Sequence, residues 1–293
     1  MEKNGPLKSP HTDAMAWLRQ LPPTEKDFIA GLFSGVIQAG LFNPWDRALY
    51  LSVKDKRRFL HKENWKNPYT GCTQSILIRT LSGGLYFPLF DIFSSYYSNR
   101  FQFSPNSLLL SFLAGNSAGA VSGCCLNGFT AIKYHSWGTG DRLVDSAMKM
   151  YRDGGLRPFF KGVCPTVLRD TVFGGMFASL KFLFAKMLRK SDGSKELLFP
   201  LWPFNALAGG LATICSSPFN YVRNIKYGTP AGKSPPTTIS CLSHLTQQAI
   251  ERPDTYQYLQ QRLRLGWGTA RVAVGMSVGY ELYDFAKLKL QPD

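Results

Sequence analysis

The chain has 293 residues, with 34 lysines and arginines against 19 aspartates and glutamates, which gives a net charge of +15 at pH 7. A positive balance of this size indicates an acidic partner, either nucleic acid or an anionic membrane surface. The six cysteines form no CxxC pair, so the sequence contains neither a disulfide framework nor a zinc motif. HExxH and Walker motifs are absent as well, and we expect the protein not to be an enzyme.

The apolar residues are clustered, although the mean hydropathy of −0.12 is low for a membrane protein. Three stretches contain no charged residue: 28–45, 101–132 and 197–222. Each is long enough to cross a hydrocarbon core, which needs about 20 helical residues. The basic segment 54–66 follows the first stretch directly, as expected of a loop on the positive side of a membrane. The sequence therefore favours a membrane protein over one that binds nucleic acid.

After a polar tail at residues 1–24, small residues recur at every fourth position of the expected spanning helices. This spacing allows two helices to approach closely in a membrane. The first helix is expected over 25–50 and the third over 106–135, and a fifth begins after a polar link. The small residues are Gly31, Gly35 and Ala39, then Gly115, Gly119 and Gly123, then Ala208, Ala212 and Ser216.

The same three helices end in variants of one motif, in which a proline is followed by an acid and then by a base. The copies are Pro44-x-Asp46, Gly128-x4-Lys133 and Pro218-x4-Arg223. The first copy keeps the acid but has Leu49 in place of the base. The other two copies keep the base but lack the acid. Their first residues lie 84 and 90 positions apart, which indicates a repeat of about that period.

Between the second and third copies lies the most distinctive stretch, residues 153–182. Gly155 leads to the triplet Phe160-Lys161-Gly162, and an ionic pair, Arg169-Asp170, follows seven residues after that glycine. Inside a bilayer each such charge costs about 3 kcal/mol unless it faces water or a partner. Arg79 follows Gly71 in a similar way, and Arg271 lies in the last helix. Three arginines at corresponding positions are expected to face one central axis, although each could instead extend to the membrane surface.

The glycine triplet, the proline motifs and the closing Tyr283-Asp284-Phe285-Ala286-Lys287 resemble the mitochondrial carrier family over residues 25–290. The resemblance implies an all-α membrane protein with six transmembrane helices in three pseudo-repeats around a central cavity. The repeats would cover 25–100, 101–190 and 191–293. It also implies the mitochondrial inner membrane as location, with both termini in the intermembrane space.

The family's motifs assign roles to individual positions. The resemblance implies that the substrate binds near the middle of the membrane, with Asp170 accepting from an ammonium group; the substrate residues would be Arg169, Asp170, Arg271 and Arg79. On the matrix side Asp46 would pair with Lys133, while Arg223 would face Thr130 and lack an acid. The opposite gate would contain Asp91, Asp284 and Lys287, without evident partners. Cardiolipin, the one bound cofactor-like molecule expected, would contact Gly71, Lys161 and Gly162.

Two functions are compatible with these positions. The first is transport of a small anionic or zwitterionic, amino-acid-like metabolite by alternating access. The alternative is a carrier fold without transport activity, used as a structural subunit of a respiratory-chain complex or another inner-membrane complex. The missing gate pairs favour the alternative, because alternating access needs two states of nearly equal free energy. The expected partners are membrane lipids, a small-molecule substrate and, in the alternative, other subunits, but no nucleic acid.

Overall fold

The computed structural model describes residues 17–290 except 19, 55–56, 105–106, 140, 190–198 and 231–232. Most of the expected tail at residues 1–24 lies outside this part of the chain. Six long helices make up the body of the protein: α2 (Pro23–Lys54), α3 (Cys72–Phe101), α4 (Leu108–Thr139), α7 (Val163–Leu188), α8 (Trp202–Gly228) and α11 (Trp267–Lys289). Shorter helices connect them: η1 (Lys62–Trp65), α5 (Leu143–Gly154), α6 (Arg157–Phe160), α9 (Thr238–Ile250) and α10 (Thr255–Leu263).

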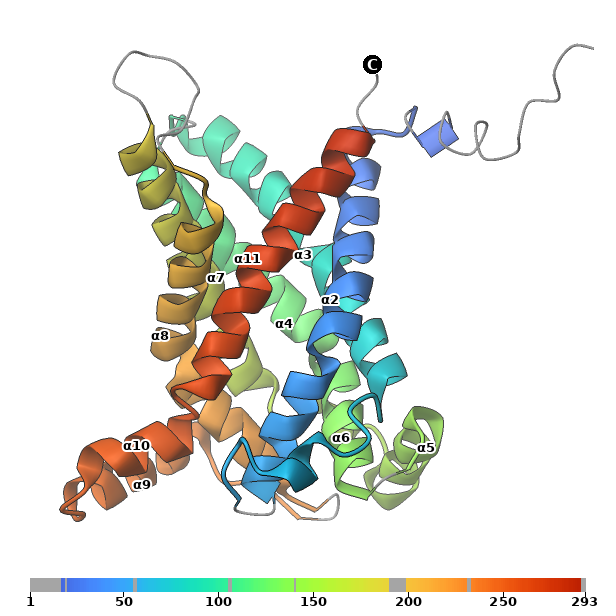
Figure 1. Ribbon diagram of the computed structural model, residues 1–293, viewed down its shortest axis with the longest axis vertical. Helices are drawn as coiled ribbons and strands as arrows, with labels where there is room; N and C mark the ends of the chain where they lie inside the picture. The colour runs from blue at the N-terminus through green and yellow to red at the C-terminus, as the bar shows by residue number, and fades with distance from the viewer. Residues whose placement is uncertain are drawn as a thin grey trace, which may run out of the picture.

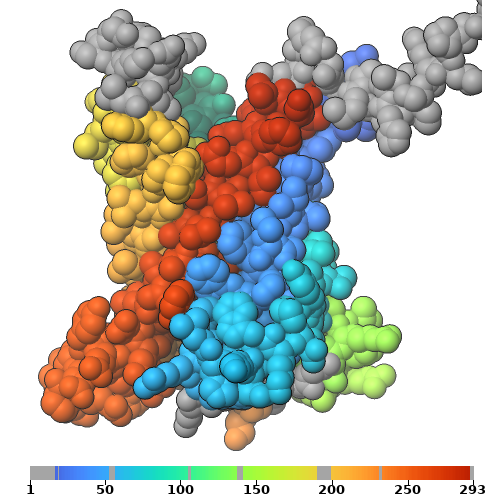
Figure 2. All heavy atoms as spheres, in the orientation of Figure 1, coloured from blue at the N-terminus to red at the C-terminus, as the bar shows by residue number. Residues whose placement is uncertain are grey.

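The six long helices form a closed ring, which Figure 1 shows from the side. Each packs against the next in the order α2, α3, α4, α7, α8 and α11, and α11 packs back against α2. Figure 2 shows α2 and α11 side by side along their length. The short helices gather at one end, whereas the start of α2 and the end of α11 lie at the other. The predicted fold class, six helices around a central axis, is confirmed.

Three of the six long helices are apolar and long enough to cross a membrane by length and composition alone. These segments are Cys72–Phe101, Leu108–Ser136 and Arg157–Leu188, and they are neighbours in the ring. The uncharged stretches 28–45 and 197–222 lie instead in α2 and α8, which do not reach that hydropathy. Glycine, serine, asparagine and proline lower the hydropathy of these helices without adding charge. Absence of charge was therefore a weaker indicator of apolar character than we expected.

The glycines at four-residue spacing bring neighbouring helices into backbone contact. A Cβ atom on Gly31 of α2 would clash with the carbonyl oxygen of Gly83 in α3. In the same way, Gly115 of α4 lies against the carbonyl oxygen of Gly174 in α7. The predicted close approach of the helices is thus confirmed in the α2–α3 and α4–α7 pairs.

Two further glycines precede the second and the fourth of the six long helices. Gly71 precedes α3 with φ +73° and Gly162 precedes α7 with φ +77°. Glycine adopts this left-handed conformation without the steric cost that other residues incur. Each glycine therefore turns the chain from the loop end of the ring back into a long helix, which positions Arg79 and Arg169 along the next helix.

Candidate substrate site and gates

Three of the predicted site residues meet in one cluster, although they come from three helices. Asp46 of α2 accepts from Arg79 Nη2 of α3 at 2.6 Å and from Arg271 Nη2 of α11 at 2.8 Å. Arg271 Nε lies 2.5 Å from the other oxygen of the same carboxylate. The Arg271 guanidinium also lies over the ring of Phe42, 4.9 Å from its centroid, and only 6% of the residue is exposed. The cluster thus holds two buried or half-buried cations and one anion.

Asp46 has two ion-pair partners, Arg79 and Arg271, that the sequence did not predict, and the expected pair of Asp46 with Lys133 stays a prediction. Arg79 and Arg271 bind the Asp46 carboxylate, while Lys133 lies near enough to act on it electrostatically. The reason is the order of the helices in the ring. Helices α3 and α11 flank α2, whereas α4, which carries Lys133, is one helix further away. The gate acid and two expected substrate arginines therefore form a single unit.

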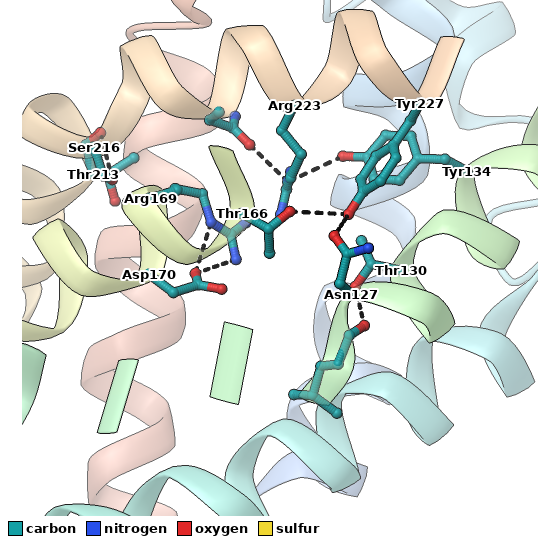
Figure 3. Close-up of polar contacts among 12 residues, drawn as sticks. Asn127, Thr130, Tyr134, Thr166, Arg169, Asp170, Thr213, Ser216, Arg223 and Tyr227 are labelled. Atoms are coloured by element: carbon teal, nitrogen blue, oxygen red, sulfur yellow. Dashed lines mark hydrogen bonds and ion pairs between the residues drawn. The ribbon is translucent and has the colours of Figure 1, made fainter. Parts of the chain in front are cut away.

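A second cluster surrounds Arg169 and Asp170 of α7 (Figure 3). Arg169 Nε donates to Asp170 Oδ1 at 2.7 Å, and Arg169 Nη2 donates to the same oxygen. Gly123 of α4 makes room for the acid, because a Cβ atom there would lie 2.8 Å from Asp170 Oδ2. The pair is partly open, with 28% of the Arg169 side chain and 21% of the Asp170 side chain exposed.

Arg223 of α8 lies beside this pair but has neutral partners. Its Nη2 donates to Asn220 Oδ1 at 2.7 Å and to the Tyr134 hydroxyl at 3.4 Å. Its guanidinium carbon lies 5.7 Å and 5.8 Å from the ring centroids of Tyr134 and Tyr227. The hydroxyl of the expected neighbour Thr130 donates within its own helix, to Leu126 O at 2.9 Å. The prediction that Arg223 lacks an acid agrees with this geometry.

Sequence reasoning missed the polar residues that support this second cluster. The Tyr227 hydroxyl donates to Asn127 Oδ1 at 2.7 Å and lies 3.0 Å from Thr166 Oγ1. Asn127 Nδ2 in turn donates to Phe159 O at 2.8 Å, as Asn43 Nδ2 does to Pro68 O at 2.7 Å. The two asparagines precede Gly128 and Pro44 and so share the repeat spacing. That recurrence could have identified them from the sequence. Each asparagine joins its helix, α2 or α4, to the segment that follows it.

At the other end of the ring Lys287 does have a partner, which corrects the expectation. Its Nζ lies 2.7 Å from Asp27 Oδ1, and the Tyr283 hydroxyl donates to the same oxygen at 2.9 Å. Asp27 is buried at the start of α2 and was not singled out, because no motif marks it. The other two expected gate acids, Asp91 and Asp284, are exposed and form no ion pair with any residue that the structure describes.

The expected lipid residues lie at the loop end of the ring. Gly71 and Gly162 precede the N-termini of α3 and α7. The Lys161 ammonium donates to Pro230 O at 2.6 Å and so ties the start of α7 to the third loop.

Comparison with known proteins agrees with this architecture. A family model described as Mitochondrial carrier protein matches residues 104–192. The mitochondrial glycine transporter of Xenopus tropicalis is 28% identical over 70% of this chain and 73% of its own length. The human mitochondrial glycine transporter is 27% identical over 69% and 72%. The mitochondrial phosphate carrier protein 1 of Arabidopsis thaliana is 29% identical over 58% and 57%.

These relatives are transporters and carriers by name, so they support solute transport and give no support to the alternative of a structural subunit. Transport, not catalysis, is the activity of this family. The three helices that are apolar enough to cross a membrane fit a multi-pass membrane protein. The comparisons therefore support membership of the mitochondrial carrier family, whose members are solute carriers of the mitochondrial inner membrane.

Proposed function

We propose that the transported solute is a small zwitterionic amino acid, with glycine as the first to test, and that it moves by alternating access. The observation that carries the proposal is the partly open pair of Arg169 and Asp170, which places a guanidinium and a carboxylate side by side. A zwitterion presents the complementary charges. Its carboxylate can bind the guanidinium of Arg169 in a charge-assisted, two-bond contact, and its ammonium can donate to Asp170.

The other arginines support a solute that carries a carboxylate. Arg79 and Arg271 share the single carboxylate of Asp46, so their cluster has a surplus positive charge. A cationic solute would be repelled by this surplus, whereas a carboxylate would be attracted. The relatives named glycine transporters favour a small amino acid over a larger one.

The test is uptake of radiolabelled glycine by the purified protein reconstituted in liposomes. Arg169→Ala and Asp170→Asn should each lower uptake by about 10- to 100-fold, since each removes one charged partner of the solute. Arg262→Ala, at an arginine of α10 far along the chain from the pair, is the matched control and should leave uptake unchanged. Uptake that resists both pair variants would contradict the proposed site, and absence of uptake for every small amino acid would contradict the proposed solute.

We also propose that cardiolipin contacts the loop end of the ring through the backbone N–H groups that follow Gly71 and Gly162. A phosphate group is favoured at the N-terminus of a long helix because unpaired N–H groups and the helix dipole both attract it. Thermal unfolding in detergent with added cardiolipin should then show a higher midpoint than with a zwitterionic lipid. Gly162→Ala should reduce this difference, because alanine is strained at φ +77° and its Cβ would lie 2.9 Å from the Tyr227 ring. Equal midpoints with both lipids would contradict the contact.

A further inference from the structure

The Arg223 side chain is a buried cation whose charge is not neutralised by a contact. Only 6% of the residue is exposed, and its partners are an amide oxygen, a hydroxyl and two aromatic rings. Its Nε–H donates to no atom that the structure describes. A buried charge normally has a counter-charge, because desolvation of an unpaired ion is costly.

The nearby carboxylate cannot serve as that counter-charge. Asp170 acts on Arg223 only from beyond ion-pair distance, and both of its recorded contacts with Arg169 use the same acid oxygen. Figure 3 shows Arg169 of α7 and Arg223 of α8 near each other, with Thr166 of α7 beside them. Two cations and one anion therefore leave a surplus charge of one at this point.

The adjoining ion pair is partly open, with 28% of the Arg169 side chain exposed. Two positions could have supplied an acid to Arg223, and neither does. Thr130 stands where the motif would place the acid that faces Arg223, and Asn220 replaces the acid of the motif within α8.

We propose that Arg223, with Tyr134 beside it, binds one small oxyanion, which is the carboxylate of the transported solute or a free inorganic anion. The Arg223 Nε–H is the donor, and the aromatic rings fix the plane of the guanidinium. This inference deepens the proposed function by adding Arg223 to the solute site, yet the site itself can be tested without transport.

The first experiment measures thermal unfolding of the purified protein in detergent against four probes at equal ionic strength. Acetate carries a carboxylate alone, glycinamide an ammonium alone, glycine both, and inorganic phosphate represents a free anion. Acetate and glycine should raise the midpoint while glycinamide should not. A shift with acetate and glycine but not phosphate identifies a carboxylate as occupant, and a shift with phosphate identifies a free anion. If no anion raises the midpoint, the site does not exist.

Arg223→Gln separates binding from a structural role. We expect affinity for the effective anion to fall by about 10- to 100-fold. The midpoint without ligand should stay equal or rise, because an uncompensated buried charge has been removed. A lower midpoint with unchanged affinity would show that Arg223 only holds Asn220 and Tyr134 in place, and would overturn the proposal. Arg262→Gln is the matched control, since this arginine also lies over a tyrosine ring, that of Tyr258.

Asn220→Asp supplies the missing acid from within the chain. The new carboxylate would replace an amide oxygen that lies 2.7 Å from Arg223 Nη2. The unfolding midpoint without ligand should rise and the response to the anion should disappear, because the internal acid neutralises the Arg223 guanidinium. A persistent anion response in this variant would contradict the proposal. If acetate or phosphate binds through Arg223 but no amino acid is transported, the proposed solute fails while the anion site remains.

Discussion

The two arginine clusters differ in where their acid comes from, and this difference determines what each can do. In the cluster of Asp46, Arg79 and Arg271 the three groups belong to three helices, so the ion pairs join α2 to both of its neighbours in the ring. In the other cluster Arg169 and Asp170 are consecutive residues of one helix, so their ion pair does not join one helix to another. The first cluster must break when these helices separate. The second lies within one helix, so under the proposed function it would exchange its internal pair for a solute while the helices stay in place.

The largest expected effect comes from removing the shared acid. Asp46→Asn leaves two guanidinium groups, one of them 7% exposed on its side chain, without a counter-charge. Loss of one partner of a buried pair costs about 3–5 kcal/mol. The unfolding midpoint in detergent should therefore fall markedly, whereas Asp284→Asn, at an exposed acid, serves as control. Equal midpoints for the two variants would mean that Asp46 does not join the helices.

Next in size is an effect on the backbone contact beside the second cluster. A Cβ atom on Gly119 of α4 would overlap the carbonyl oxygen of Asp170, so Gly119→Ala must push α4 and α7 apart. Overpacking of this kind costs about 1–3 kcal/mol. Gly40→Ala in α2 is the matched control, because nothing lies within 4 Å of the added atom there. A drop in the midpoint for Gly119→Ala only, with loss of glycine uptake, would link this packing to the solute site.

A smaller effect is expected at the far end of the same helix pair that holds Asp46 and Arg271. The ion pair between Asp27 and Lys287 again joins α2 to α11, but 41% of the Lys287 side chain is exposed. Water screens such a pair, so its coupling energy should be about 1 kcal/mol or less. A double-mutant cycle with Asp27→Asn and Lys287→Met measures this coupling free energy of unfolding. A coupling free energy above that of the ion pairs of Asp46 would reverse the ranking of the two ends of the ring.

The sequence alone determined the long helices and the spacing of the glycines and arginines along them. Glycines at four-residue spacing fix which face of a helix can approach a neighbour, and this depends only on the pitch of the helix. For the same reason Arg79, Arg169 and Arg271 could be assigned to equivalent positions from their spacing alone. Both kinds of information are local or periodic, so a single chain displays them.

Only the tertiary structure decided which charge meets which. Asp46 binds Arg271, and Asp27 binds Lys287, across more than two hundred residues of sequence, because closure of the ring brings α11 beside α2. The motif predicted a pair of Asp46 with Lys133, and it gave no partner to Lys287. An ion pair depends on the order of helices around the ring and on the height of each side chain along the axis. Neither is encoded in the spacing of residues along one helix.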